Sequence, residues 1–194
     1  MSATRYQLLH FLANTAFKEG DFVLRSGVRS QYYLSKVDLF TKPELLHLAA
    51  KMMVEHMIST DDAYVKHIIA PETGGAMFAT AMQQILLADH HSRMSLHVYR
   101  KDGTITGIKN PLSNYIIVED VITSGKTVLN LIDCLKEHSS WSPGQVIALV
   151  DRGGEGVDKL RKIGIQVSTL FEWKELLAVN GRYQSDPAQE PGQG

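Results

Sequence analysis

The stretch YIIVEDVITSGKTVLNLI, residues 115–132, decides how the chain should fold. Its first four residues, 115–118, are apolar and predict a short buried strand, whereas residues 127–138 carry the pattern of a helix. Two adjacent carboxylates, Glu119 and Asp120, follow the predicted strand. A strand, a short polar loop and a helix in this order form the repeating unit of α/β proteins.

The same alternation of strand and helix continues on both sides of this unit. The patterns predict strands at residues 67–70, 95–99, 145–150 and 166–171, and helices at residues 42–59, 76–87, 157–163 and 172–178. Strands that alternate with helices favour right-handed crossovers. We therefore expect an α/β fold with a central parallel sheet flanked by helices, and a ligand site beyond the carboxyl ends of its strands.

The two ends of the chain differ from this pattern. We expect residues 1–40 to form an N-terminal helix over residues 5–17 and two short strands within DFVLRSGVRSQYYLSKV. Residues 41–180 form the α/β core in this prediction. Residues 181–194 are predicted to be a disordered tail, since their end, SDPAQEPGQG, has almost no apolar residue.

Composition excludes several classes of protein. The 194 residues include 20 basic and 21 acidic side chains, a net charge of −1, so no global positive field exists to bind nucleic acid or an anionic membrane. The single cysteine, Cys134, excludes an intrachain disulfide and a cysteine-based zinc site. The start has no pattern of a signal peptide and no apolar run is long enough to span a membrane, so we expect a cytoplasmic protein.

The segment TSGKT, residues 123–127, is typical of a phosphate site. Small hydroxyl residues and a glycine at a helix start leave backbone N–H groups for an anion. The carboxylates of Glu119 and Asp120 would reach hydroxyl groups or a metal beside that phosphate, so together they suggest a ribose 5-phosphate. A P-loop is excluded because Asp120 stands where that motif has its first glycine. The remaining alternative is an ordinary helix N-cap beside a chance acidic pair.

The string EDVITSGKT resembles the phosphoribosyl pyrophosphate (PRPP) signature of type I phosphoribosyltransferases, and within them the orotate branch is most similar. FVLRSGVRSQYYLS resembles the hood segment of that branch, IIAPETGGAMFATAMQ its pyrophosphate loop, VYRKDG the entry to its catalytic loop and IALVDRGGEG the segment after a core strand. The resemblance implies a Rossmann-like, type I phosphoribosyltransferase-like core with a small N-terminal hood. It also implies a homodimer with small-molecule substrates.

The resemblance carries roles onto individual residues of this sequence. It implies PRPP contacts at Thr73, Gly74, Gly75, Arg100, Lys101, Glu119, Asp120, Thr123, Ser124, Gly125, Lys126 and Thr127. It implies contacts to the base at Arg25, Tyr33, Leu34, Thr123 and Arg152. Mg²⁺ is expected to arrive with PRPP and to lie near Glu119 and Asp120, with no direct protein ligand. Lys101, Asp120 and Lys109 are the candidate catalytic residues.

The predicted catalytic loop departs from the pattern of the family. Residues 100–114, RKDGTITGIKNPLSN, contain no histidine, and Lys109 is the only lysine after Lys101. Three alternatives follow. Lys109 replaces a lysine that the family has elsewhere in this loop, another base acts, or the protein binds PRPP with little catalysis. The implied activity is transfer of the 5-phosphoribosyl group from PRPP to orotate, giving orotidine 5′-monophosphate and pyrophosphate. The alternatives are a phosphoribosyltransferase for another base and a weakly catalytic PRPP- or nucleotide-binding regulator.

Overall fold

A computed structural model describes residues 3–23, 29–59, 67–107, 115–138, 144–179 and 181. Its centre is a six-stranded sheet with the strand order β5-β4-β3-β6-β7-β8. The strands are β3 (His67–Pro71), β4 (Ser95–Tyr99), β5 (Ile105–Thr106), β6 (Tyr115–Ile122), β7 (Gln145–Asp151) and β8 (Gln166–Glu172). All neighbours pair in parallel except β5, which is antiparallel to β4. The predicted α/β sheet is confirmed, with this one antiparallel strand at its edge.

The strand order reverses between β3 and β6. The chain passes from β3 outward to β4, and then returns to the other side of β3 to build β6, β7 and β8. The crevice outside the carboxyl ends of two such neighbouring strands is the usual ligand site of an open α/β sheet. The segments PETGG and EDVITSGKT therefore meet at this point.

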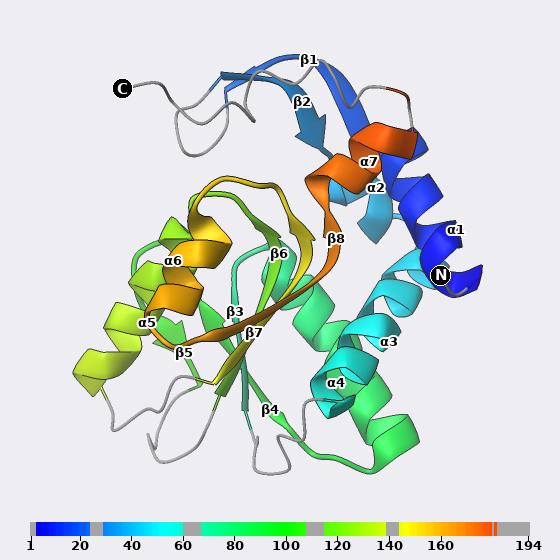
Figure 1. The fold of residues 1–194 in the computed structure, drawn as a ribbon. Coiled ribbons are helices and arrows are strands. Elements are labelled where there is room, and N and C mark those ends of the chain that lie inside the picture. Colours follow the sequence, from blue (N-terminus) through cyan, green and yellow to red (C-terminus); the bar gives the residue numbers. More distant parts are fainter. Residues whose placement is uncertain are drawn as a thin grey trace.

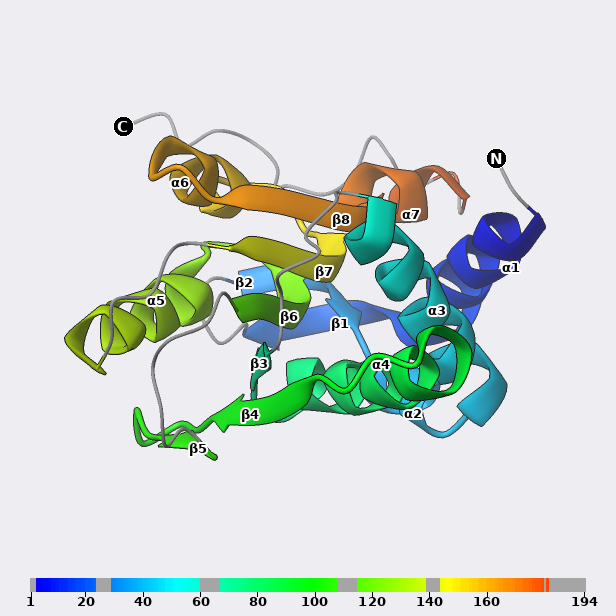
Figure 2. The ribbon, with the colours of Figure 1, turned by 90° about the horizontal axis from the view of Figure 1, so that it is seen from below.

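Helices cover both faces of the sheet, as Figures 1 and 2 show. On one face α3 (Pro43–Ser59) and α4 (Gly74–His90) pack on Ile68 and Ile116, and on the other α5 (Lys126–His138) and α6 (Gly156–Lys162) pack on Ile69 and Ile117. Successive strand residues point to opposite faces, so a run of apolar residues serves both layers. This is why the core strands read as continuous apolar segments in the sequence.

The described residues of the first forty, 3–23 and 29–40, are called the hood below and lie beside the sheet. They contain α1 (Ala3–Phe11), the π-helical turn η1 (Leu12–Ala16), β1 (Phe17–Val23), β2 (Arg29–Leu34) and α2 (Lys36–Phe40). The two predicted strands are confirmed as an antiparallel pair. In Figure 1 this pair lies at the top, on the side where β8 runs into α7 (Trp173–Val179).

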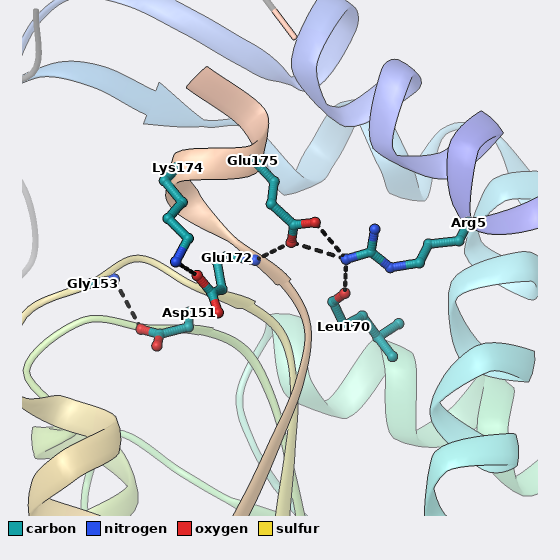
Figure 3. Close-up of polar contacts among 7 residues, drawn as sticks. All are labelled: Arg5, Asp151, Gly153, Leu170, Glu172, Lys174 and Glu175. Carbon is teal, nitrogen blue, oxygen red and sulfur yellow. Dashed lines mark hydrogen bonds and ion pairs between the residues drawn. The ribbon is translucent and has the colours of Figure 1, made fainter. Parts of the chain in front are cut away.

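Side chains near the end of β8 attach the hood to the core. Arg5 of α1 donates through Nη2 to both carboxylate oxygens of Glu175, at 2.7 and 2.9 Å, and to the carbonyl oxygen of Leu170 at 3.0 Å (Figure 3). The Arg5 guanidinium also lies 4.8 Å from the ring centroid of Phe171. Hydrogen bonds between ionised groups are stronger than those between neutral groups. The hood is therefore held by residues far from it in the sequence.

Four details differ from the sequence prediction. The helix expected over residues 5–17 ends earlier, because Phe17 already pairs with Leu34 in the hood sheet. Strand β6 runs on to Ile122, since β7 provides partners for its last residues, so the acidic pair lies within the strand. The short elements α2 and β5 were not predicted. Of the predicted tail, residues 181–194, all but residue 181 lie outside the described residues.

No helix in the described part of the chain combines the length and the apolar character that crossing a bilayer requires.

Candidate active site

A cleft of about 650 Å³ lies at the carboxyl ends of the central strands and reaches the hood. Most of the predicted site residues line it: Tyr33, Leu34, Gly74, Arg100, Lys101, Glu119, Asp120, Thr123, Ser124, Gly125, Lys126, Thr127 and Arg152. Thr73 and Gly75 flank Gly74 but are not among the lining residues. Arg25 and Lys109 lie outside the described residues. Segments from five parts of the sequence thus meet at one cleft.

The acidic pair forms a fixed part of the cleft wall. Glu119 and Asp120 are each only 6% exposed. Glu119 Oε1 accepts a hydrogen bond from the Asp120 amide at 2.9 Å, and Asp120 Oδ1 accepts one from the Val121 amide at 2.7 Å. Backbone donors hold each carboxylate in one orientation. The pair can therefore present oxygen acceptors to a ligand without first being ordered by it.

Helix α4 begins directly against this pair. A Cβ atom on Gly74 would lie 1.8 Å from Asp120 Oδ2, and one on Gly75 would lie 2.4 Å from the Val118 carbonyl oxygen. Only glycine lets the helix start so close to β6. The first turn of a helix carries N–H groups that have no partner within the helix, and its dipole attracts anions. Gly74 brings this helix end to the cleft.

A second helix start, that of α5, meets the cleft through the segment 123–127. Gly125 has a φ angle of 72°, which glycine adopts without strain. The Thr123 carbonyl oxygen accepts a hydrogen bond from the Gly156 amide at 3.1 Å, and a Cβ atom on Gly156 would lie 2.4 Å from that oxygen. The start of α6 therefore supports the loop from behind. Two helix N-termini directed at one cleft suit a ligand with two separate anionic groups.

Arg100 and Lys101 begin the segment that follows β4, and Glu72 holds it in place. The Lys101 amide donates to Glu72 Oε1 at 2.9 Å, while the Glu72 amide donates to the Tyr99 carbonyl oxygen at 2.9 Å. Glu72 also lines the cleft. This role of Glu72 was not predicted from the sequence. It stands within PETGG, but nothing local shows that its side chain reaches a loop 29 residues away.

Arg152 links the cleft to the hood. It is 7% exposed, and its Nη2 donates to Ser30 Oγ and to the Tyr32 carbonyl oxygen, both at 2.7 Å. Its guanidinium lies 4.2 Å from the ring centroid of Trp173. The family resemblance implied a contact with the base for Arg152. The structure gives Arg152 a second role, since it also bonds strand β2 to the core.

A pair of histidines lies away from the cleft. His67 Nδ1 and His97 Nε2 are 3.0 Å apart, and the ring of Tyr115 packs against both. Burial, followed by the nearby His67, lowers the pKa of His97 from its ordinary value of 6.5. A neutral imidazole is thus favoured at this position in the folded protein.

Comparison with known proteins finds relatives by sequence, although not among family models. No family model matches the chain. The chain is 34% identical over 164 residues to an orotate phosphoribosyltransferase of Pyrococcus abyssi, covering 80% of this chain and 88% of the relative. It is 30% identical over 180 residues to that of Pyrococcus horikoshii, covering 90% and 94%.

Solved structures agree with the fold. The orotate phosphoribosyltransferase of Aeropyrum pernix has a TM-score of 0.75 at 25% identity, covering 90% of this chain and 99% of the other. That of Mycobacterium tuberculosis in complex with PRPP has a TM-score of 0.69 at 18% identity, covering 89% and 98%. Because the chain is 34% and 30% identical to the two Pyrococcus relatives over most of both chains, it belongs to the family of orotate phosphoribosyltransferases.

Proposed function

We propose that the protein transfers the 5-phosphoribosyl group of PRPP to orotate, giving orotidine 5′-monophosphate and pyrophosphate. One observation carries this proposal beyond family membership. The cleft joins two helix N-termini, a buried acidic pair and a buried arginine, and these suit the two phosphate groups, the ribose diol and the anionic base of that reaction.

The two ends of PRPP suit different parts of the cleft. The 5-phosphate fits the start of α5, where the segment 123–127 offers backbone N–H and hydroxyl donors. The pyrophosphate fits the start of α4 at Gly74, beside Arg100 and Lys101. The ribose between them lies against Glu119 and Asp120, whose carboxylates accept hydrogen bonds from its hydroxyl groups. We infer this orientation from the order of the donors along the cleft.

The proposed chemistry breaks the bond between the anomeric carbon and pyrophosphate and forms a bond to the base nitrogen. As pyrophosphate departs, positive charge develops on the ribose ring, as in glycoside cleavage. The carboxylate of Asp120 stabilises this charge. The α4 N-terminus, Arg100 and Lys101 stabilise the negative charge on the leaving group. The orotate nitrogen is acidic enough that a strong general base is not needed.

We propose Mg²⁺ as the metal of this reaction, bound together with PRPP. Glu119 and Asp120 are hard oxygen donors in the cleft wall, which fits this ion. Within the described residues, no group of three or more histidine, cysteine or acidic residues could hold a metal. Pyrophosphate oxygens and water would supply the ligands of the ion, with Glu119 and Asp120 nearby, and the ion would neutralise the charge that builds on the leaving group.

The base is proposed to bind between the core and the hood. Its carboxylate would pair with the Arg152 guanidinium, and Tyr33 and Leu34 would flank its ring. The roles of Arg25 and Lys109, the homodimer and the cytoplasmic location stay predictions. The composition of residues 100–114, which contain no histidine, favours the second candidate function, a weakly catalytic PRPP- or nucleotide-binding regulator.

The test is an assay of the purified protein with PRPP, Mg²⁺ and one base at a time: orotate, uracil, hypoxanthine, guanine or adenine. We expect orotate to be consumed at about one turnover per second or faster, with equimolar release of pyrophosphate. Consumption of a different base would instead favour a phosphoribosyltransferase for that base. PRPP binding without consumption of any base would overturn the proposal and favour the regulator. Lys109→Ala should slow the best reaction if that lysine acts.

A further inference from the structure

We propose that Trp173 is a positioning residue for Arg152 and that Ser30 has the same role. Together they would determine how strongly the site prefers a base that carries a carboxylate. This inference rests on the proposed function, because it concerns the recognition of orotate by the same cleft. It assigns a role in ligand selectivity to a buried tryptophan that does not line the cleft.

The contacts of Arg152 fix its guanidinium in two independent ways. The ring of Trp173, 4.2 Å from the guanidinium carbon, sets the plane of the group. The bonds from Nη2 to Ser30 Oγ and to the Tyr32 carbonyl oxygen, both 2.7 Å, set its rotation within that plane. A hydrogen bond from the guanidinium to a carboxylate requires both to be correct. These contacts therefore prepare Arg152 for a planar anion before the ligand arrives.

The three partners that orient the cation in these contacts carry no charge of their own. The hydroxyl of Ser30, the carbonyl of Tyr32 and the indole of Trp173 are all uncharged. Arg152 is 7% exposed, so its charge acts in a medium of low dielectric, where attraction to an anion is stronger than in water. A ligand carboxylate gains from this charge, whereas a neutral hydrogen at the same position does not.

Trp173 is itself held rigidly enough to serve this purpose. It is 1% exposed and is the first residue of α7, directly after β8. Its ring centroid lies 4.9 Å from that of Phe17, which in turn lies 5.0 Å from that of Tyr32. Tyr32 supplies one of the two oxygens that Arg152 bonds. The tryptophan, the hood and the arginine therefore form a closed set of contacts.

The experiment compares two nucleotides that differ only in the carboxylate. The dissociation constants of orotidine 5′-monophosphate and uridine 5′-monophosphate are measured by calorimetry for the wild type and for Trp173→Leu, Trp173→Phe and Ser30→Ala. We expect Trp173→Leu to lower the preference for orotidine 5′-monophosphate about tenfold by weakening only that ligand. Trp173→Phe keeps a ring and should restore most of the preference. Ser30→Ala should reduce it severalfold.

Phe171→Leu provides the matched control. Phe171 is also buried, lies two residues earlier and contacts Arg5 rather than Arg152, with the guanidinium 4.8 Å from its centroid. Its loss should lower the thermal midpoint but leave the nucleotide preference unchanged, which separates positioning from general stability. If Trp173→Leu does not fold, Trp173→Phe and Ser30→Ala decide the question.

Two results would overturn the inference. One is an unchanged preference in Ser30→Ala and in every Trp173 variant that folds, and the other is a wild type that binds both nucleotides equally. Failure of the proposed function itself is seen elsewhere, in the turnover assay of the wild type with orotate, so the two failures are distinguishable.

Discussion

Replacing Gly74 with alanine tests the close packing of α4 against the acidic pair. The new Cβ atom would lie 1.8 Å from Asp120 Oδ2 and 2.5 Å from its carboxyl carbon. Nonbonded carbon and oxygen atoms keep about 3.0 Å or more apart, so the two groups must separate by about 1.2 Å. Because Asp120 Oδ1 is held by the Val121 amide at 2.7 Å, the carboxylate cannot turn away without losing that bond.

The expected loss of activity follows from this displacement. A shift of about 1 Å in a catalytic group costs roughly 100-fold in rate, so we expect kcat/KM for PRPP to fall by about that factor, or about 2.7 kcal/mol. Overpacking of this kind lowers the free energy of unfolding by about 1–3 kcal/mol. The assay is initial-rate kinetics with orotate and PRPP, combined with urea unfolding of the same preparations.

A second substitution and a control separate the clash with the Asp120 carboxylate from a general loss of stability. Asp120→Ala removes the clashing carboxylate and leaves only the Cβ atom of residue 120, 3.0 Å away, so adding Gly74→Ala to that variant should cost much less further stability. Gly144→Ala creates a similar clash away from the cleft, since its Cβ would lie 2.0 Å from the Tyr115 carbonyl oxygen, and should lower stability while the folded enzyme keeps its kcat/KM. An active Gly74→Ala protein, or a stability cost that persists without the Asp120 carboxylate, would refute the reasoning.

Two further predictions concern stability. Because the pKa of His97 lies below 6.5 in the folded protein, the unfolded chain binds more protons as pH falls past 6.5. The free energy of unfolding should therefore fall by up to about 1.4 kcal/mol per pH unit as the pH drops from 6.5 toward the folded pKa. His97→Gln should reduce this slope in urea titrations between about pH 5 and 7.5. Equal slopes in the wild type and the variant would contradict the prediction. Arg5→Met removes the bonds to Glu175 and Leu170 and should lower the free energy of unfolding by about 1–2 kcal/mol, a modest value because both charged side chains are about 30% exposed. An unchanged urea midpoint would show that this contact does not hold the hood.

Local pattern was enough to predict the elements that build the cleft. The apolar run before Glu119 predicts a strand, and the glycine and hydroxyl residues after it predict a helix start. The structure has both elements. Strand β6 nevertheless continues past the predicted end, because pairing with β7 overrides the low strand propensity of two carboxylates. A prediction from one segment cannot include the partner strand.

The contacts that the sequence did not reveal are those that join distant segments. Arg152 and Ser30 are 122 residues apart, and Lys101 and Glu72 are 29 apart, yet each pair shares a hydrogen bond. Both glutamate and serine are common on protein surfaces, so their identity gives no signal. Trp173 is buried, and its contact with Arg152 depends on how β8 and the hood come together.

The attachment of the hood to the end of β8 also sets the order in which the chain can fold during synthesis. Arg5 bonds Leu170, 165 residues later, so the first helix is made long before its partner exists. At the usual speed of translation, about 5–20 residues per second, this interval lasts roughly 10–30 s. During that time the apolar side chains of Leu8 and Leu12 lack part of their final packing. The nascent chain therefore exposes its N-terminal helix as a candidate site for chaperone binding until the last strand and helix leave the ribosome.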